Sequence, residues 1–135
     1  MRTRLLAAAF TALAALSGCA SGSDRGSAVV VGDGVLVVDW TIDDAKDSRD
    51  CASQGADGID VVVSTAAGDV VGDFNAYCEA FDLSIQLAPG SYNGDATLLD
   101  AAGRPRTTSV DLGRFTIYGD DELHVPIDFP LDSFL

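Results

Sequence analysis

Hydrophobic and polar residues alternate through most of the chain after residue 28, and a period of two predicts β-strands. The clearest early example is the segment 34–42, GVLVVDWTI, in which Leu36, Val38, Trp40 and Ile42 share one face. We therefore expect a half-buried strand there. The segment 28–35, AVVVGDGV, is a candidate for a short preceding strand with a Gly-Asp-Gly turn leading into it.

The same alternation continues to the C-terminus, with glycine-rich or proline-containing turns between the apolar runs. Expected turns are AAGD at 66–69, Pro89-Gly90 and DAAG at 100–103. Pro126 cannot donate a ladder hydrogen bond, so the last strand is expected at a sheet edge or at a bulge. Inward-facing positions of these later strands are Ile59, Val61, Val63, Phe81, Leu83, Ile85, Leu87, Phe115, Ile117, Leu123, Val125, Ile127 and Phe129.

About seven short strands in roughly 100 residues predict an all-β fold, an antiparallel β-sandwich. The segment 43–55, DDAKDSRDCASQG, lacks an apolar stripe at helical spacing. We expect it to form a loop with one helical turn at most.

The N-terminus has the organisation of an export signal. Two arginines, Arg2 and Arg4, precede an uncharged apolar run from Leu5 to Leu16. That run suits a signal peptide and is shorter than the roughly 20 residues of a spanning helix. An ordinary secretory leader is one interpretation of this pattern.

The residues that follow, Leu16-Ser17-Gly18-Cys19, resemble the lipobox of bacterial lipoproteins. The resemblance implies that residues 1–18 are a lipoprotein signal peptide, cleaved before Cys19, and that the Cys19 thiol carries diacylglycerol. The new amino terminus would then be acylated, and several acyl chains make anchoring essentially permanent. Ala20 in place of an aspartate favours the outer over the inner membrane, with the domain in the periplasm or at the cell surface.

A serine- and glycine-rich stretch, residues 19–30, is expected to be a flexible tether between the lipid and a domain over 31–135. Two cysteines, Cys51 and Cys78, remain in that domain. In an exported protein such a pair predicts a structural disulfide, with a metal-binding or redox-active pair as alternatives.

Charge excludes one class of function. Without Arg2 and Arg4 the chain keeps six basic against 21 acidic residues, a net charge of −15. Such a surface repels phosphate backbones, so nucleic-acid binding is excluded.

The segment 87–107, LAPGSYNGDATLLDAAGRPRT, resembles the L-x-x-G-x-Y … L-x-D-x-x-G segment of prealbumin-like and carboxypeptidase-regulatory-like sandwich modules. The layout of residues 35–135 also resembles uncharacterised bacterial lipoproteins of that shape. The resemblance implies that Tyr92 packs near a strand start and Gly103 serves a turn, and it brings no catalytic residue. An immunoglobulin-like sandwich is the alternative topology.

Few residues are candidates for chemistry. His124 is the only histidine, and alternation places it on the solvent face of the last strand. We therefore expect no catalytic residue and no enzyme. The acidic segment around 39–50 offers oxygen ligands of the kind calcium prefers, but its spacing does not match an EF-hand loop. Its weak calcium candidates are Asp39, Asp43, Asp44, Asp47 and Asp50.

Taken together, these features predict an envelope-anchored lipoprotein that acts as a non-enzymatic interaction or structural module. Its membrane contact is the N-terminal lipid, and its partner is an envelope protein or a glycan. Two alternatives are a calcium-dependent carbohydrate-binding module and a small hydrolase, and calcium is the one cofactor considered.

Overall fold

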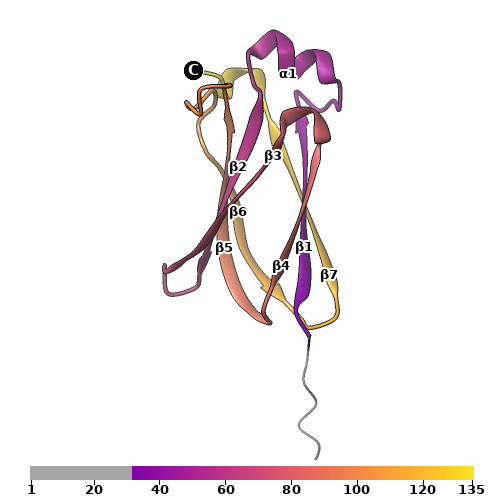
Figure 1. Ribbon diagram of the computed structural model, residues 1–135, viewed down its shortest axis with the longest axis vertical. Helices are drawn as coiled ribbons and strands as arrows, with labels where there is room; N and C mark the ends of the chain where they lie inside the picture. Colours follow the sequence, from indigo (N-terminus) through magenta and orange to yellow (C-terminus); the bar gives the residue numbers. More distant parts are fainter. Residues whose placement is uncertain (1–31) are drawn as a thin grey trace, which may run out of the picture.

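A computed structural model describes residues 32–135, in which two β-sheets pack face to face (Figure 1). This confirms the predicted all-β sandwich of seven strands. The expected strand within 28–35 lies largely outside the described residues, and β1 begins at Gly34. The strands are β1 (Gly34–Ile42), β2 (Gly58–Thr65), β3 (Val70–Tyr77), β4 (Asp82–Leu87), β5 (Gly90–Leu99), β6 (Val110–Ile117) and β7 (Glu122–Phe129), and the helices are α1 (Ser48–Gln54) and the 3-10 turns η1 (Cys78–Ala80) and η2 (Leu131–Ser133).

The smaller sheet has the order β4-β1-β7. Strands β1 and β4 are antiparallel, but β1 and β7 run parallel, with Val35 opposite Glu122 and Ile42 opposite Phe129. The expectation of a purely antiparallel sandwich is therefore corrected at this pair. The chain leaves β1 for the other sheet and returns from that sheet along β7, so the two strands are joined by a long crossover and can be parallel.

The larger sheet has the order β3-β2-β5-β6, and its neighbours are antiparallel. The turn at 66–69 joins β2 to β3, which confirms that predicted turn. In the immunoglobulin arrangement the first two strands are neighbours in one sheet. Here β1 and β2 lie in different sheets, so the topology differs from the immunoglobulin alternative.

The core between the sheets is built from the predicted inward faces. Leu36, Val38, Trp40 and Ile42 are fully buried, as are Val61 and Val63 on β2. Phe129 at the end of β7 is also fully buried, but its inward neighbours Leu123, Val125 and Ile127 are half-buried. Strand β7 has β1 as its one partner within residues 32–135, so it is an edge strand, as Pro126 predicts.

Helix α1 is longer than the single turn expected from the sequence. The Asp47 side chain accepts a hydrogen bond from the Arg49 backbone N–H at its start, and Gly55 ends it in the left-handed region at φ 67°. These two caps supply hydrogen-bond partners to backbone groups at the helix ends, and a hydrophobic pattern does not reveal such caps. One buried residue, Cys51, suffices to fix the helix because it is covalently tied.

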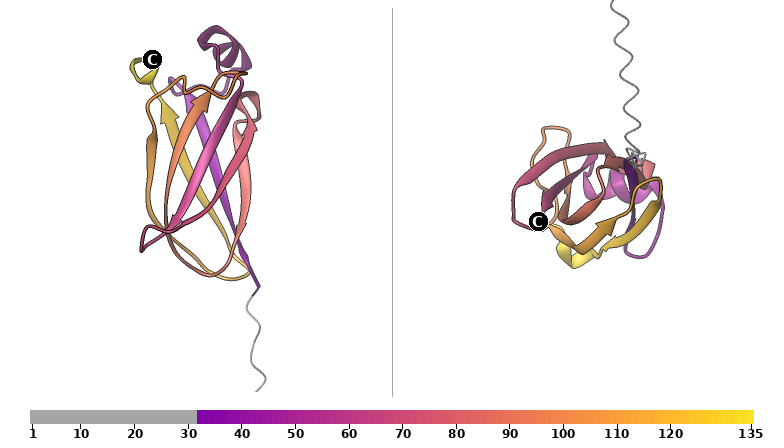
Figure 2. Two further views of the ribbon diagram at one scale, coloured as in Figure 1. Left: turned by 60° about the vertical axis from the view of Figure 1, so that its left-hand side comes forward. Right: turned by 90° about the horizontal axis from the view of Figure 1, so that it is seen from below.

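The two ends of the sandwich differ in what they carry. Helix α1, η1, the β5–β6 connection and the C-terminus lie at one end, and β1 begins at the other (Figures 1 and 2). The chain therefore enters the domain at the end opposite α1. No helix among residues 32–135 combines the length and the apolar character that a membrane crossing requires.

Candidate functional site

The end of the sandwich that carries α1 is held together by a covalent and a polar link. The predicted disulfide is present and joins Cys51 of α1 to Cys78 of η1. Arg106 donates from Nε and Nη2 to the backbone carbonyl of Gln54, at 3.0 and 2.8 Å, and so fastens the last turn of α1 to the β5–β6 connection. Three segments far apart in the sequence are thereby fixed relative to one another.

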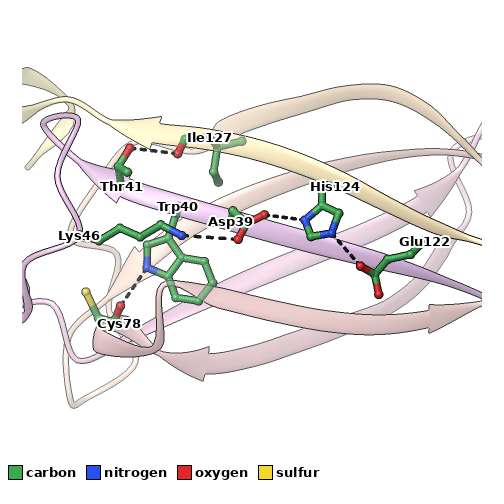
Figure 3. A network of polar contacts seen from close by, with 8 residues as sticks. All are labelled: Asp39, Trp40, Thr41, Lys46, Cys78, Glu122, His124 and Ile127. Atoms are coloured by element: carbon green, nitrogen blue, oxygen red, sulfur yellow. Dashed lines mark hydrogen bonds and ion pairs between the residues drawn. The ribbon is translucent and has the colours of Figure 1, made fainter.

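The backbone of η1 is anchored to the core below it. Trp40 donates from Nε1 to the carbonyl oxygen of Cys78 at 2.9 Å, in a fully buried setting (Figure 3). The Trp40 ring also contacts Phe81, with ring centroids 6.3 Å apart. Phe81 ends η1 in the left-handed region at φ 58°, which turns the chain into β4. This strained position is held by the packing of both aromatic rings.

A hollow of about 490 Å³ opens beside this anchored end. Gly58 is paired with Tyr77 of β3 on one side and with Leu99 of β5 on the other. Directly paired residues project from the same face of a sheet, so the missing side chain at Gly58 leaves a gap between Tyr77 and Leu99. The apolar lining of the hollow comprises Ile59, Ala76, Tyr77, Ala80, Leu99 and Ala101.

A second, smaller hollow of about 210 Å³ adjoins the first and is lined by α1 and η1, including both disulfide cysteines. Asp57 and Tyr77 line both hollows, and we refer to the two together as the Tyr77 groove. Tyr77 is 74% exposed, so its ring stands at the boundary of the two hollows with most of its surface in solvent. An exposed aromatic residue beside an apolar hollow is typical of a binding site.

The charged residues that line the Tyr77 groove are all acidic: Asp57, Glu79 and Asp100. Asp100 accepts hydrogen bonds from the backbone N–H of Ala102 and of Arg104, and it pairs with the Arg104 guanidinium at 2.8 Å. The Arg104 backbone bond is the main reason that the pKa of Asp100 lies below its usual value. Asp100 is thus engaged in the turn predicted at 100–103, whereas Asp57 and Glu79 are exposed at the groove.

A separate polar cluster lies on the outer face of the smaller sheet, where β1 and β7 meet (Figure 3). His124 contacts Asp39 Oδ2 through Nδ1 at 3.0 Å and Glu122 Oε1 through Nε2 at 2.7 Å. Lys46 Nζ lies 3.5 Å from Asp39 Oδ1. The hydrogen bond to Asp39, and then that to Glu122, raises the pKa of His124, and the bond to His124 is the main cause of the lowered pKa of Asp39.

This geometry favours the doubly protonated imidazolium form of His124, because both ring nitrogens face carboxylates. A general base needs a ring nitrogen with a free lone pair directed at a reacting proton. The arrangement therefore stabilises a surface ion-pair cluster, and it places His124 on the solvent face as alternation predicts.

The five acidic residues considered for calcium are found in different roles. Asp39 is in the His124 cluster, Asp43 and Asp44 occupy left-handed turn positions after β1, and Asp47 caps α1, whose first turn holds Asp50. Hydrogen bonds from Arg49 to Asp47 lower the pKa of that carboxyl to about 2. Within residues 32–135, no group of three or more histidine, cysteine or acidic side chains is placed to hold a metal ion. The calcium site stays a prediction without support from these residues.

Sequence reasoning did not find the Tyr77 groove. The sequence contained one sign of it: Tyr77 follows Asp73 and Asn75 at alternate positions, so this aromatic residue lies on the polar face of its strand. The hollow itself depends on the register of three strands, which no local pattern reveals. The lipidation candidate Cys19 lies outside the described residues.

Comparisons with known proteins give no family assignment. No protein-family model matches the chain, and no curated protein matches it. Two solved structures show a partial similarity to the chain. One is a leucine-rich repeat protein from Bacteroides thetaiotaomicron VPI-5482, which is 17% identical with a TM-score of 0.49 over 72% of this chain. The other is a candidate adhesin from Bacteroides ovatus, which is 12% identical with a TM-score of 0.46 over 71% of this chain. The chain covers 12% of the first structure and 46% of the second, so it spans less than half of either protein.

Proposed function

We propose that this protein is a cell-envelope lipoprotein whose sandwich is a non-enzymatic binding module, and that the module holds an apolar group of another envelope component in the Tyr77 groove. The observation that carries this proposal is the groove itself. It combines an apolar hollow of about 490 Å³ with a tyrosine that is 74% exposed. Tyrosine at such a position supplies contact area at low cost in conformational entropy.

The position of the groove agrees with attachment through Cys19. The chain enters β1 at the end of the sandwich opposite α1, and the groove lies at the α1 end (Figure 2). A lipid on Cys19 would tether the module from the β1 side, so the groove would face away from the membrane that carries the lipid. The domain would then present the groove to another component across the periplasm or outside the cell.

The rigidity of the groove also supports a binding role. Its walls come from the disulfide-linked α1 and η1 and from the paired strands β2, β3 and β5. A preformed site loses little conformational entropy when it is occupied, so more of the contact energy appears as affinity.

The proposal is tested by affinity capture from the detergent-solubilised envelope of the native bacterium with three forms of the protein. The wild type and a Tyr118→Ala control are expected to recover the same component, and Tyr77→Ala is expected to lose it. Tyr118 is a matched control because it is 68% exposed and lies outside the groove. Equal recovery by Tyr77→Ala and the wild type, or recovery of nothing specific by the wild type, would refute the proposed function.

A further inference from the structure

The four edge strands of the sandwich differ in how well they are protected against pairing with another chain. Within residues 32–135 these are β4 and β7 in one sheet and β3 and β6 in the other. Proline, bulges and lysine are the usual protections of an edge. Strand β7 has Pro126 in its middle, and β6 has an extra residue, Leu112, opposite the Gly94–Asp95 step of β5.

Strands β3 and β4 lack lysine and proline. Strand β3 has an extra residue, Val71, near its start, but it is regularly paired from Gly72 to Tyr77. Of the two, β3 is the strand that lines the Tyr77 groove, through Asn75, Ala76 and Tyr77. The side of β3 turned away from β2 has no hydrogen-bonded strand partner among residues 32–135, so an unpaired edge and the apolar groove are contiguous.

The outer face beside this edge carries negative charge. Asp73 of β3 and Asp95 of β5 are both paired with Val62 of β2, so the two carboxylates lie on the same face, on either side of β2. Asp60 lies one row closer to the groove, opposite Asn75. Burial, and then repulsion by Asp73, raises the pKa of Asp60, so these two carboxylates are close enough to disfavour each other's charge. Lysine or arginine beside them would relieve this repulsion.

We propose that the β3 edge and the Tyr77 groove bind one extended segment of a partner protein, in which an apolar residue is followed two and four residues later by basic residues on the same face of the strand. The segment adds a strand beside β3, places an apolar side chain against Tyr77 in the groove, and directs a basic side chain to Asp73 and Asp60. Strand addition supplies affinity through backbone hydrogen bonds, and alternate side chains supply specificity. This inference rests on the proposed function and specifies the chemistry of the partner.

Charge complementarity selects this occupant over a second copy of the chain. The chain contains 21 acidic and eight basic residues, and β3 itself has Asp73 as its one charged residue. Two copies paired through β3 would bring like charges together, which destabilises cross-strand pairs. A basic segment is attracted instead, and its association should weaken as salt rises.

The probe is a fluorescein-labelled nine-residue peptide with valine at position 3, lysine at positions 5 and 7 and threonine elsewhere, so that these three side chains share one face. Its binding to the full chain carrying Cys19→Ala is measured by fluorescence anisotropy. Two further peptides replace lysine by glutamate or N-methylate alternate backbone amides. The lysine peptide is expected to bind, the glutamate peptide is not, and N-methylation is expected to weaken binding because it removes donors along one edge.

The protein variants locate the site. Asp73→Lys is expected to weaken binding about tenfold, since it replaces an attraction by a repulsion. Tyr77→Ala, which removes the exposed ring of the groove, is expected to weaken it as well. Asp33→Lys makes the same change of charge at an exposed residue beside the start of β1 and is expected to leave binding unchanged. Trp40 fluorescence confirms that each variant is folded.

Three results would overturn the inference. The first is that the lysine peptide does not bind. The second is that Asp73→Lys and Asp33→Lys reduce its binding equally. The third is that sedimentation reveals a dimer, which Asp73→Lys dissociates. The envelope capture distinguishes this failure from failure of the proposed function. If Tyr77→Ala loses the captured component and Asp73→Lys retains it, the proposed binding module stands and strand addition to β3 is excluded.

Discussion

Removing the disulfide gives the most direct energetic test of the structure. Cys51 and Cys78 are 27 positions apart, so the bond closes a loop of 28 residues in the unfolded chain. The chain-entropy model assigns such a loop about 12 cal/mol/K, or about 3.6 kcal/mol at 25 °C. This is a large fraction of the roughly 5–15 kcal/mol that separates folded from unfolded domains.

Unfolding in urea measures this contribution in a Cys19→Ala background, where the two domain cysteines are the remaining thiols. Trp40 is the only tryptophan and is fully buried, so its fluorescence reports loss of the core. Reduction of the disulfide is expected to lower the free energy of unfolding by about 3.6 kcal/mol. The melting temperature should fall by about 16 °C for a domain of this size.

A Cys51→Ala/Cys78→Ala variant serves as the comparison for the reduced protein. It is expected to lose about 1 kcal/mol more, because both sulfur atoms are buried and their removal leaves small cavities. A loss below about 1 kcal/mol in both forms would refute the reasoning. That result would mean that α1 detaches locally and that the sandwich does not depend on the cross-link.

Three further outcomes are expected. Tyr92→Phe removes the hydroxyl that donates to the Ala88 carbonyl at 2.7 Å and should cost about 1 kcal/mol in urea unfolding; an unchanged midpoint would contradict that bond. The raised pKa of His124 means that its cluster stabilises the fold fully below the unfolded value near 6.5 and loses this contribution as pH rises through the folded value. In an NMR titration Asp39→Asn should therefore lower the pKa of His124, and a pKa that does not change would count against the contact. Cys19→Ala should abolish incorporation of labelled fatty acid and release the protein from the membrane fraction; retention there after leader removal would exclude the lipid anchor.

Local pattern alone was enough to predict most of the strands and their buried faces. The inward residues of β1 and β2 are fully or almost fully buried because a period of two leaves one possible face for the core. The disulfide was predicted because two cysteines in an exported domain have few other uses, and the edge position of β7 because Pro126 lacks a donor.

Other features depended on contacts between distant segments. The parallel pairing of β1 with β7 brings His124 to Asp39, 85 positions away, and no window of sequence contains both. Helix α1 owes its second turn to caps and to Cys51, whereas its own residues form no apolar stripe. The Tyr77 groove exists because Gly58 falls between Tyr77 and Leu99, and that coincidence requires the register of β2 with two partners. Periodicity thus determined which side of each strand is buried, and only tertiary structure decided which strands meet and where the surface is left open, because register is a property of pairs.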